Sequence, residues 1–140
     1  MNRMTKLTTC ALVALALAGC ASVKGTDRVA NGTIDEVAKL QKRPATEKET
    51  AAVLTALQQV AKDPSSVRVQ DVYVDVGGAQ YLGFCGNAIG KDSDGKLGQA
   101  APVNGVFDTT EAKIQAHNLR VGKLAGELCK RMNYPLPTQP

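Results

Sequence analysis

The N-terminal segment is the feature that most constrains what this chain can fold into. Two basic residues, Arg3 and Lys6, precede an apolar run of about 13 residues that ends at Gly19, which is shorter than the roughly 20 residues of a membrane-spanning helix. A basic start, a short apolar run and small residues at its end are typical of a secretory signal peptide. We therefore expect residues 1–19 to be removed and the folded part to mature outside the cytoplasm, starting at Cys20.

The end of this run, Leu17-Ala18-Gly19-Cys20, closely resembles the lipobox of bacterial lipoproteins. The resemblance implies cleavage before Cys20, a thioether-linked lipid on Cys20 and acylation of its amino group. Three acyl chains would anchor the protein stably in a membrane. The alternatives are an ordinary signal peptide followed by a fortuitous cysteine, or an apolar helix of a soluble protein.

The residues after Cys20, Ala21-Ser22, lack the aspartate that retains lipoproteins in the inner membrane of enteric-type bacteria. In a two-membrane organism, the resemblance therefore implies anchoring in the outer membrane, facing the periplasm.

The charge of the mature chain is modest. Two of the 17 basic residues leave with the signal peptide while all 13 acidic residues stay, which leaves a net charge of about +2. The remaining basic residues are scattered, and only Lys42-Arg43 and Lys130-Arg131 are adjacent pairs. This pattern argues against binding to nucleic acid.

Two of the four cysteines remain for the mature domain, because Cys10 lies in the signal peptide and Cys20 would carry the lipid. An even pair in an oxidising compartment usually forms a disulfide, so we expect a Cys85–Cys129 bond. Such a bond would close a loop of roughly 45 residues, worth about 4 kcal/mol in the chain-entropy model. The alternatives are two buried thiols or a free catalytic thiol.

Residues 20–45 are expected to be a lipidated tether that contains a possible short helix. Thr33 and Glu36 have the spacing of a capping box, and the helix should stop near Arg43, before Pro44. The sequence does not decide whether this helix docks on the domain.

A second capping box begins at Thr46 and predicts a helix that ends by Asp63, before Pro64. Alternating valines then predict a strand from Val67 to Val76. The alternation changes phase between Val69 and Val72, which predicts a β-bulge.

Gly77-Gly78 predicts a hairpin turn into a second strand over Gln80 to Ile89. Val103 to Phe107 could form a third strand, with Pro102 favouring an edge position before it. Apolar residues at steps of three and four from Ile114 then predict a final helix of about 20 residues, which would end near Met132 and be capped by Asp108.

These elements predict a small α+β domain over residues 46–134, followed by a tail over 135–140. It would contain an N-terminal helix, a two- to three-stranded antiparallel sheet and a long C-terminal helix, with one disulfide joining the second strand to that helix.

A second resemblance covers this domain. Lys62-Asp63-Pro64-Ser65-Ser66, Cys85-Gly86-Asn87 and the late Cys129 resemble a group of small exported bacterial proteins, many of them lipoproteins. They share a lysine-aspartate-proline-x-serine turn and a cysteine-glycine strand. This chain lacks the aromatic residue that usually follows the cysteine-glycine. The group has no well-established activity to carry over.

Nucleophilic catalysis would need Cys85 as a thiolate, His117 as its base, and Asn118 or Asn87 to orient that base. A lone histidine on the apolar side of a predicted helix is more often a packing residue. A Cys85–Cys129 disulfide would remove this mechanism, so a cysteine hydrolase is the third-ranked hypothesis.

Acidic residues offer two weaker candidates. Asp92-Ser93-Asp94-Gly95 looks like part of a calcium loop, but a turn explains it without the missing ligands. Asp71, Asp75 and Asp108 could act as acid–base carboxylates, although we expect Asp71 and Asp75 to face solvent and Asp108 to cap a helix.

The sequence therefore favours a non-catalytic, lipid-anchored envelope protein with a binding or structural domain and possibly a partner in the envelope. No motif indicates an enzyme, a cofactor or a metal site, and we expect none of them. The second hypothesis is an inhibitor of a hydrolase such as a lysozyme, with Lys91 to Gly98 as the inserting loop.

Overall fold

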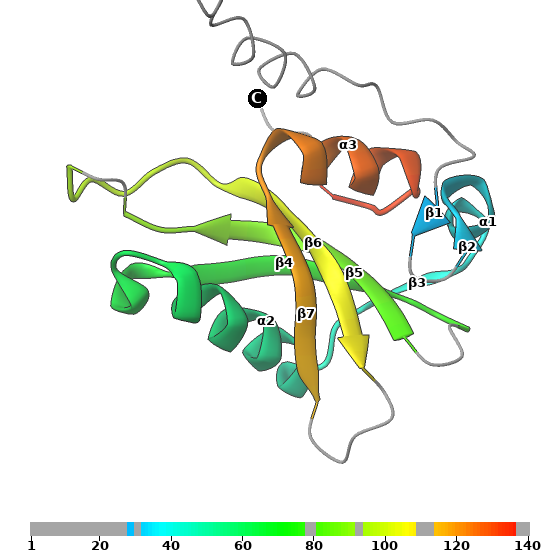
Figure 1. The fold of residues 1–140 in the computed structure, drawn as a ribbon, viewed down its shortest axis with the longest axis horizontal. Helices are drawn as coiled ribbons and strands as arrows, with labels where there is room; N and C mark the ends of the chain where they lie inside the picture. The colour runs from blue at the N-terminus through cyan, green and yellow to red at the C-terminus, as the bar shows by residue number, and fades with distance from the viewer. Residues whose placement is uncertain (1–27, 30–31, 78–80, 92–93, 109–113, 137–140) are drawn as a thin grey trace, which may run out of the picture.

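A computed structural model describes residues 28–29, 32–77, 81–91, 94–108 and 114–136. The signal segment and Cys20 lie outside the described residues. Figure 1 shows a twisted five-stranded antiparallel sheet in the order β3-β4-β5-β6-β7, with helices on both of its faces and a separate β1–β2 hairpin beside it. The strands are β1 (Arg28–Val29), β2 (Gly32–Thr33), β3 (Lys42–Pro44), β4 (Arg68–Asp75), β5 (Tyr81–Ile89), β6 (Ala101–Asp108) and β7 (Gln115–Val121). The helices are α1 (Ile34–Ala38), α2 (Glu47–Val60), a 3-10 turn (Pro64–Ser66) and α3 (Lys123–Arg131).

Both N-terminal helices begin at the capping boxes that the sequence predicts. Thr33 and Glu36 cap α1 reciprocally, and Thr46 and Glu49 cap α2 in the same way. Each threonine oxygen accepts a backbone N–H of the first turn, and each glutamate accepts from the threonine N–H. The segment around α1 docks on the domain, because Ile34 and Val37 are buried and β3 pairs with β4.

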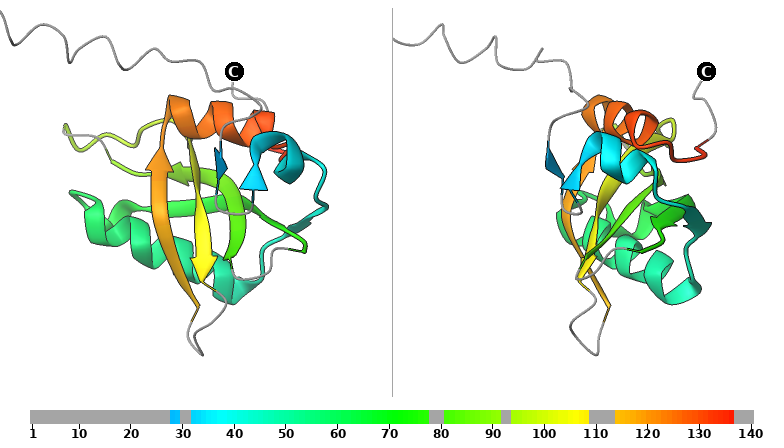
Figure 2. Two further views of the ribbon diagram at one scale, coloured as in Figure 1. Left: turned by 45° about the vertical axis from the view of Figure 1, so that its right-hand side comes forward. Right: turned by 90° about the vertical axis from the view of Figure 1, so that its right-hand side faces the viewer.

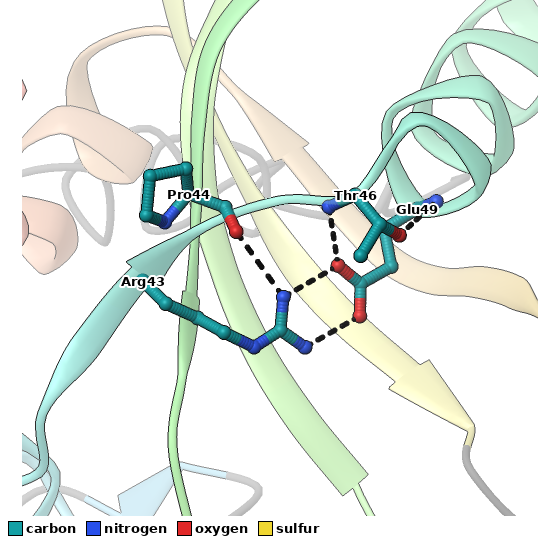
Figure 3. Close-up of polar contacts among 4 residues, drawn as sticks. All are labelled: Arg43, Pro44, Thr46 and Glu49. Carbon is teal, nitrogen blue, oxygen red and sulfur yellow. Dashed lines mark hydrogen bonds and ion pairs between the residues drawn. The ribbon is translucent and has the colours of Figure 1, made fainter.

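A bidentate ion pair fastens β3 to the start of α2 (Figure 3). The guanidinium of Arg43 donates to both carboxylate oxygens of Glu49, at 2.8 and 2.7 Å, and also to the carbonyl of Pro44. Glu49 is 5% exposed although it is charged. Its fork with Arg43 and its bonds to Thr46 lower the pKa of the Glu49 carboxyl.

The sheet contains two β-bulges of the same design. In β4, Asp71 and Val72 lie opposite the single residue Gly86, which confirms the phase shift that the sequence predicts. In β7, Asn118 and Leu119 lie opposite Gly105. The first residue of each bulge has a left-handed backbone, with φ of 53° at Asp71 and 52° at Asn118. Each bulge turns an apolar side chain, Val72 or Leu119, toward α2.

The predicted long C-terminal helix is wrong. Residues Gln115–Val121 form an edge strand, and α3 covers only Lys123–Arg131. The bulge at Asn118 places Ala116 and Leu119 on the same face three residues apart, and this spacing imitates one helical turn. Gly122, with φ of 99°, then ends the strand and begins the helix.

The fold class is therefore corrected from a two- to three-stranded α+β domain to a mainly β fold with a five-stranded sheet. Asp108 ends β6, and residues 109–113 of the predicted cap lie outside the described part. The expectation that Pro102 marks an edge is also wrong, because β6 lies between β5 and β7. The carbonyl of Pro102 accepts from Gly122 where β7 ends, so the missing N–H of Pro102 interrupts no ladder.

Figure 2 shows α2 on one face of the sheet and α1 and α3 on the other, and each face has its own hydrophobic core. The α2 face is a close-packed apolar cluster in which the rings of Phe84 and Phe107 lie 4.6 Å apart. The α3 face packs α1, α3 and the residues after α3 against the sheet. Alternation along β5 sends Phe84 to the first cluster and Cys85 to the second.

The predicted Cys85–Cys129 disulfide is present, and it ties β5 to α3 with a Cα–Cα distance of 5.9 Å. Both cysteines are buried, at 0% and 2% exposed. The bond is therefore part of the core on the α3 face. Across the described ranges, no helix has the length and apolar character that crossing a bilayer would require.

Candidate functional site

A cavity of about 390 Å³ lies on the α3 face, between α3, the sheet and the segment that contains β1 and α1. This volume falls in the lower part of the range of about 300–1,000 Å³ that is usual for small-molecule sites. Apolar residues make up about half of its lining. The apolar lining residues of the α3 face are Val29, Ile34, Val37, Val106, Leu124, Leu128 and Met132. Phe84 also borders the cavity, but its side chain packs in the cluster on the α2 face.

The polar lining of the cavity is centred on Asp75, the last residue of β4. Asp75 is 1% exposed, so the expectation that it faces solvent is wrong. Lys42 Nζ lies 3.1 Å from Asp75 Oδ1 and also donates to the carbonyls of Val37 and Leu40, at 2.8 and 2.9 Å. The ammonium thus donates to two backbone carbonyls, and its charge is balanced by the ion pair with Asp75.

Three buried side chains bring polar atoms to the cavity that lack a hydrogen-bond partner among the described residues. They are Asp75 Oδ2, Asn104 Oδ1 and the hydroxyl of Tyr134. Asn104 is 5% exposed and Tyr134 is 7% exposed. A buried polar atom without a partner costs free energy, and a cluster of three such atoms around one cavity is a feature of binding sites.

Tyr134 follows α3, and its ring lies under the Lys42 ammonium, which is 4.9 Å from the ring centroid. Burial raises the pKa of the Tyr134 hydroxyl, and the negative charge of Asp75 raises it further. The phenol is therefore protonated at every physiological pH and can donate a hydrogen bond. A side-chain interaction of the hydroxyl with the Asp75 carboxylate also raises this pKa, although the two groups do not reach full hydrogen-bonding geometry.

Gly83 in β5 makes room for this cluster. A Cβ atom at this position would lie 2.5 Å from Asp75 Oδ2 and 3.1 Å from the Tyr134 hydroxyl. The structure shows that the neighbours of Gly83 are the two polar groups of the cavity.

The rim of the cavity is basic and partly apolar. Arg28 and Arg120 both line it and are both exposed. Arg120 makes no ion pair with any residue in the described part of the chain. Leu124, at the start of α3, is 47% exposed beside them. The site thus combines a charge-balanced Lys42–Asp75 pair and neutral polar groups at its floor with apolar walls and positive charge at its mouth.

The proposed catalytic residues do not come together. Cys85 is bonded to Cys129 beneath α3, so its sulfur is not available as a thiolate. His117 is an exposed residue of β7 that lines a shallow groove beside α2, not a residue on a helix. Asn118 lines the cavity, and Asn87 is buried in β5.

The other predicted sites are also separate from the cavity. Asp71 is exposed in the β4 bulge, and Asp108 ends β6. Asp92 and Ser93 of the possible calcium loop lie outside the described residues. Where the structure describes side chains, no group of three metal-ligating residues occurs. Lys91 and Leu97 form a bridge at the base of the loop between β5 and β6, and Leu97 is 66% exposed.

Sequence reasoning missed Asn104, Tyr134, Lys42 and the burial of Asp75. The alternation of β4 contains a usable signal, because Tyr73 and Asp75 occupy the same face, opposite Val72 and Val74. That face is buried only because α3 and the segment before β3 cover it. No local pattern reports this long-range contact.

The comparisons with known proteins give no match. No protein family matches this chain, and neither a curated protein nor a solved structure resembles it significantly.

Proposed function

We propose that this protein is a lipid-anchored cell-envelope protein whose domain binds a small molecule, without catalysis, in the cavity beneath α3. The observation that carries the proposal is the set of partnerless polar atoms of Asp75, Asn104 and Tyr134 at the cavity floor. A ligand that supplied their hydrogen bonds would remove the cost of burying them, and the apolar walls would bind its hydrocarbon part.

The anchor in this proposal is a lipid on Cys20, with the domain facing the periplasm from the outer membrane. The resemblance of Leu17-Ala18-Gly19-Cys20 to a lipobox supports it. Arg28, which lines the cavity, follows Cys20 by eight residues, a span of at most about 30 Å when fully extended. The cavity would therefore open close to the membrane surface.

The experiment compares small molecules that are released when the membrane-purified protein is denatured. Leu124→Trp would fill the mouth of the cavity, and Val60→Trp is the control, because Val60 is 79% exposed and lies at the end of α2. We expect mass spectrometry to find a stoichiometric compound in the wild type and in Val60→Trp, and to find it depleted in Leu124→Trp. An absence of any such compound from the wild type, or equal amounts in all three proteins, would contradict the proposal.

The hydrolase-inhibitor hypothesis remains the alternative. The described residues between β5 and β6 project from the body of the domain in Figure 1, and among them the exposed Leu97 could enter an active site. Inhibition of a lysozyme that is lost in Leu97→Asp and retained in Leu124→Trp would favour this alternative over the cavity.

A further inference from the structure

We infer that the ligand of the α3 cavity is a small organic acid whose opposite end carries an uncharged hydrogen-bond donor, such as a primary amide. This inference rests on the proposed function and adds the chemical class of the ligand. It follows from the polarity of the floor, the walls and the rim of the cavity.

The floor requires donors. Asp75 Oδ2 and Asn104 Oδ1 are both acceptors, and neither accepts a hydrogen bond within the described ranges. A ligand group with two N–H bonds, such as a carboxamide, could donate to both oxygens, and its carbonyl could accept from the Tyr134 hydroxyl. One amide group would thus satisfy all three polar side chains.

The floor also disfavours a charged head group. Lys42 already neutralises Asp75, and both side chains are nearly fully buried, at 6% and 1% exposed. A ligand ammonium would lose its hydration beside the Lys42 ammonium with no unbalanced negative charge to compensate. A neutral donor avoids this cost.

The walls and the rim define the rest of the ligand. The apolar side chains between floor and mouth, including Val106 and Leu128, favour a hydrocarbon segment. The two arginines at the mouth, Arg28 and Arg120, favour a carboxylate at the outer end. Because both arginines are exposed, this contribution should be smaller than that of the floor.

Four six-carbon compounds separate these contributions: the monoamide of hexanedioic acid, hexanoic acid, hexanamide and 6-aminohexanoic acid. We would titrate each into the full mature protein in detergent micelles and follow the methyl NMR signals of valine and leucine. Leu124, Leu128 and Val106 report on the cavity, and Leu57 and Val53 report on the α2 face.

The monoamide should shift the cavity methyl signals and bind most tightly. Hexanoic acid should bind at least about 10-fold more weakly, because it leaves the buried acceptors without donors. 6-Aminohexanoic acid should bind at least about 10-fold more weakly, because its ammonium would lose its hydration beside the Lys42 ammonium. Hexanamide should bind about threefold more weakly, through loss of an exposed ion pair.

Variants of the rim test the carboxylate. Arg120→Gln should weaken the monoamide about threefold and leave hexanamide unchanged. Arg131→Gln is the control, because Arg131 is an exposed arginine of α3 that does not line the cavity. Equal loss in both variants would contradict the assignment of Arg120.

Two outcomes would overturn the inference. If hexanoic acid or 6-aminohexanoic acid binds as tightly as the monoamide, the cavity binds ligands, but the inference that it requires an uncharged hydrogen-bond donor is wrong. If no compound shifts the cavity signals at millimolar concentration, the chemical class is wrong. Mass spectrometry of the compounds released from the membrane-purified protein tests the proposed function separately. A failure of the proposed function can therefore be distinguished from a failure of the proposed ligand class.

Discussion

The two faces of the sheet differ in what they bury and in how closely it packs. The α2 face is an uninterrupted apolar cluster in which Phe84, Phe107, Val53 and Leu57 are all 5% exposed or less. The α3 face contains a disulfide, a buried Lys42–Asp75 ion pair and a cavity in place of close packing. The α2 face therefore contributes mainly stability, whereas the α3 face contains buried polar groups and a cavity.

This contrast explains where the covalent bond lies. The cavity and the partnerless polar atoms weaken packing beneath α3, and α3 itself has only nine residues. The Cys85–Cys129 bond offsets that weakness by fixing α3 to β5. The α2 face needs no such bond, since its helix has 14 residues, a capping box and the Arg43–Glu49 fork.

The largest effect should come from removing the disulfide. Changing both Cys85 and Cys129 to Ala should lower the free energy of unfolding by about 4 kcal/mol, because the open chain gains loop entropy when it unfolds. Urea denaturation measures the loss. Native-state hydrogen exchange should show that α3 amides lose protection before α2 amides. Equal loss of protection in both helices would contradict the division between the two faces.

A matched pair of leucines tests the packing difference. Leu57 in α2 and Leu128 in α3 are 5% and 7% exposed. Leu57→Ala should cost about 3–4 kcal/mol, whereas Leu128→Ala should cost about 2 kcal/mol, because Leu128 already borders a cavity and loses fewer contacts. Urea denaturation with the disulfide intact compares them. A larger loss for Leu128→Ala would mean that the α3 face is the better packed one.

The stabilisation that the Arg43–Glu49 fork gives to the α2 side depends on pH. Arg43→Gln should cost about 1 kcal/mol at neutral pH, a value kept low because the guanidinium is 37% exposed. The folded-state pKa of Glu49 is lowered from 4.5, so this stabilisation is present above pH 4.5 and is lost as the pH falls through the folded-state value. The difference between wild type and variant in urea denaturation should therefore vanish in acid. A difference that stayed constant down to pH 2 would contradict the assignment.

The smallest effect concerns the bulge in β7. Asn118 has φ of 52°, a conformation that glycine adopts with less strain, so Asn118→Gly should raise stability by about 0.5 kcal/mol. Gln115→Gly, in the same strand at an ordinary φ, should lower stability by a similar amount. Thermal unfolding of both variants measures the pair. A loss of stability in Asn118→Gly would show that the side chain, not the backbone, determines the bulge.

Local signals in the sequence predicted several elements of this fold but not its class. The Thr33 and Thr46 capping boxes mark both N-terminal helices, and the phase shift before Val72 marks the first bulge. The sequence does not predict the bulge at Asn118, because β7 lacks the run of β-branched residues that marks β4 as a strand. Ile114, His117 and Val121 follow one another at steps of three and four residues, which predicts a helix, although all three are exposed in the structure.

The candidate site was less predictable than the fold. Its polar residues come from β3, β4, β6 and the segment after α3, and no two of them are close in sequence. Asp75 follows a run of valines that looks like a half-exposed strand. Its burial depends on α3, which the sequence placed inside a longer helix. Because the C-terminal helix was predicted to be too long, the cavity beneath α3 could not be predicted.

The most direct test of the account as a whole is the intact mass of the protein purified from its native membrane, measured before and after reduction in the presence of a thiol-alkylating reagent. If the domain is exported and lipid-anchored and its disulfide joins α3 to β5, the mass should be that of residues 20–140 plus acyl chains. No alkylation should occur until Cys85 and Cys129 are reduced. An unlipidated mass that retains residues 1–19, or free alkylation of Cys85 without reductant, would contradict it.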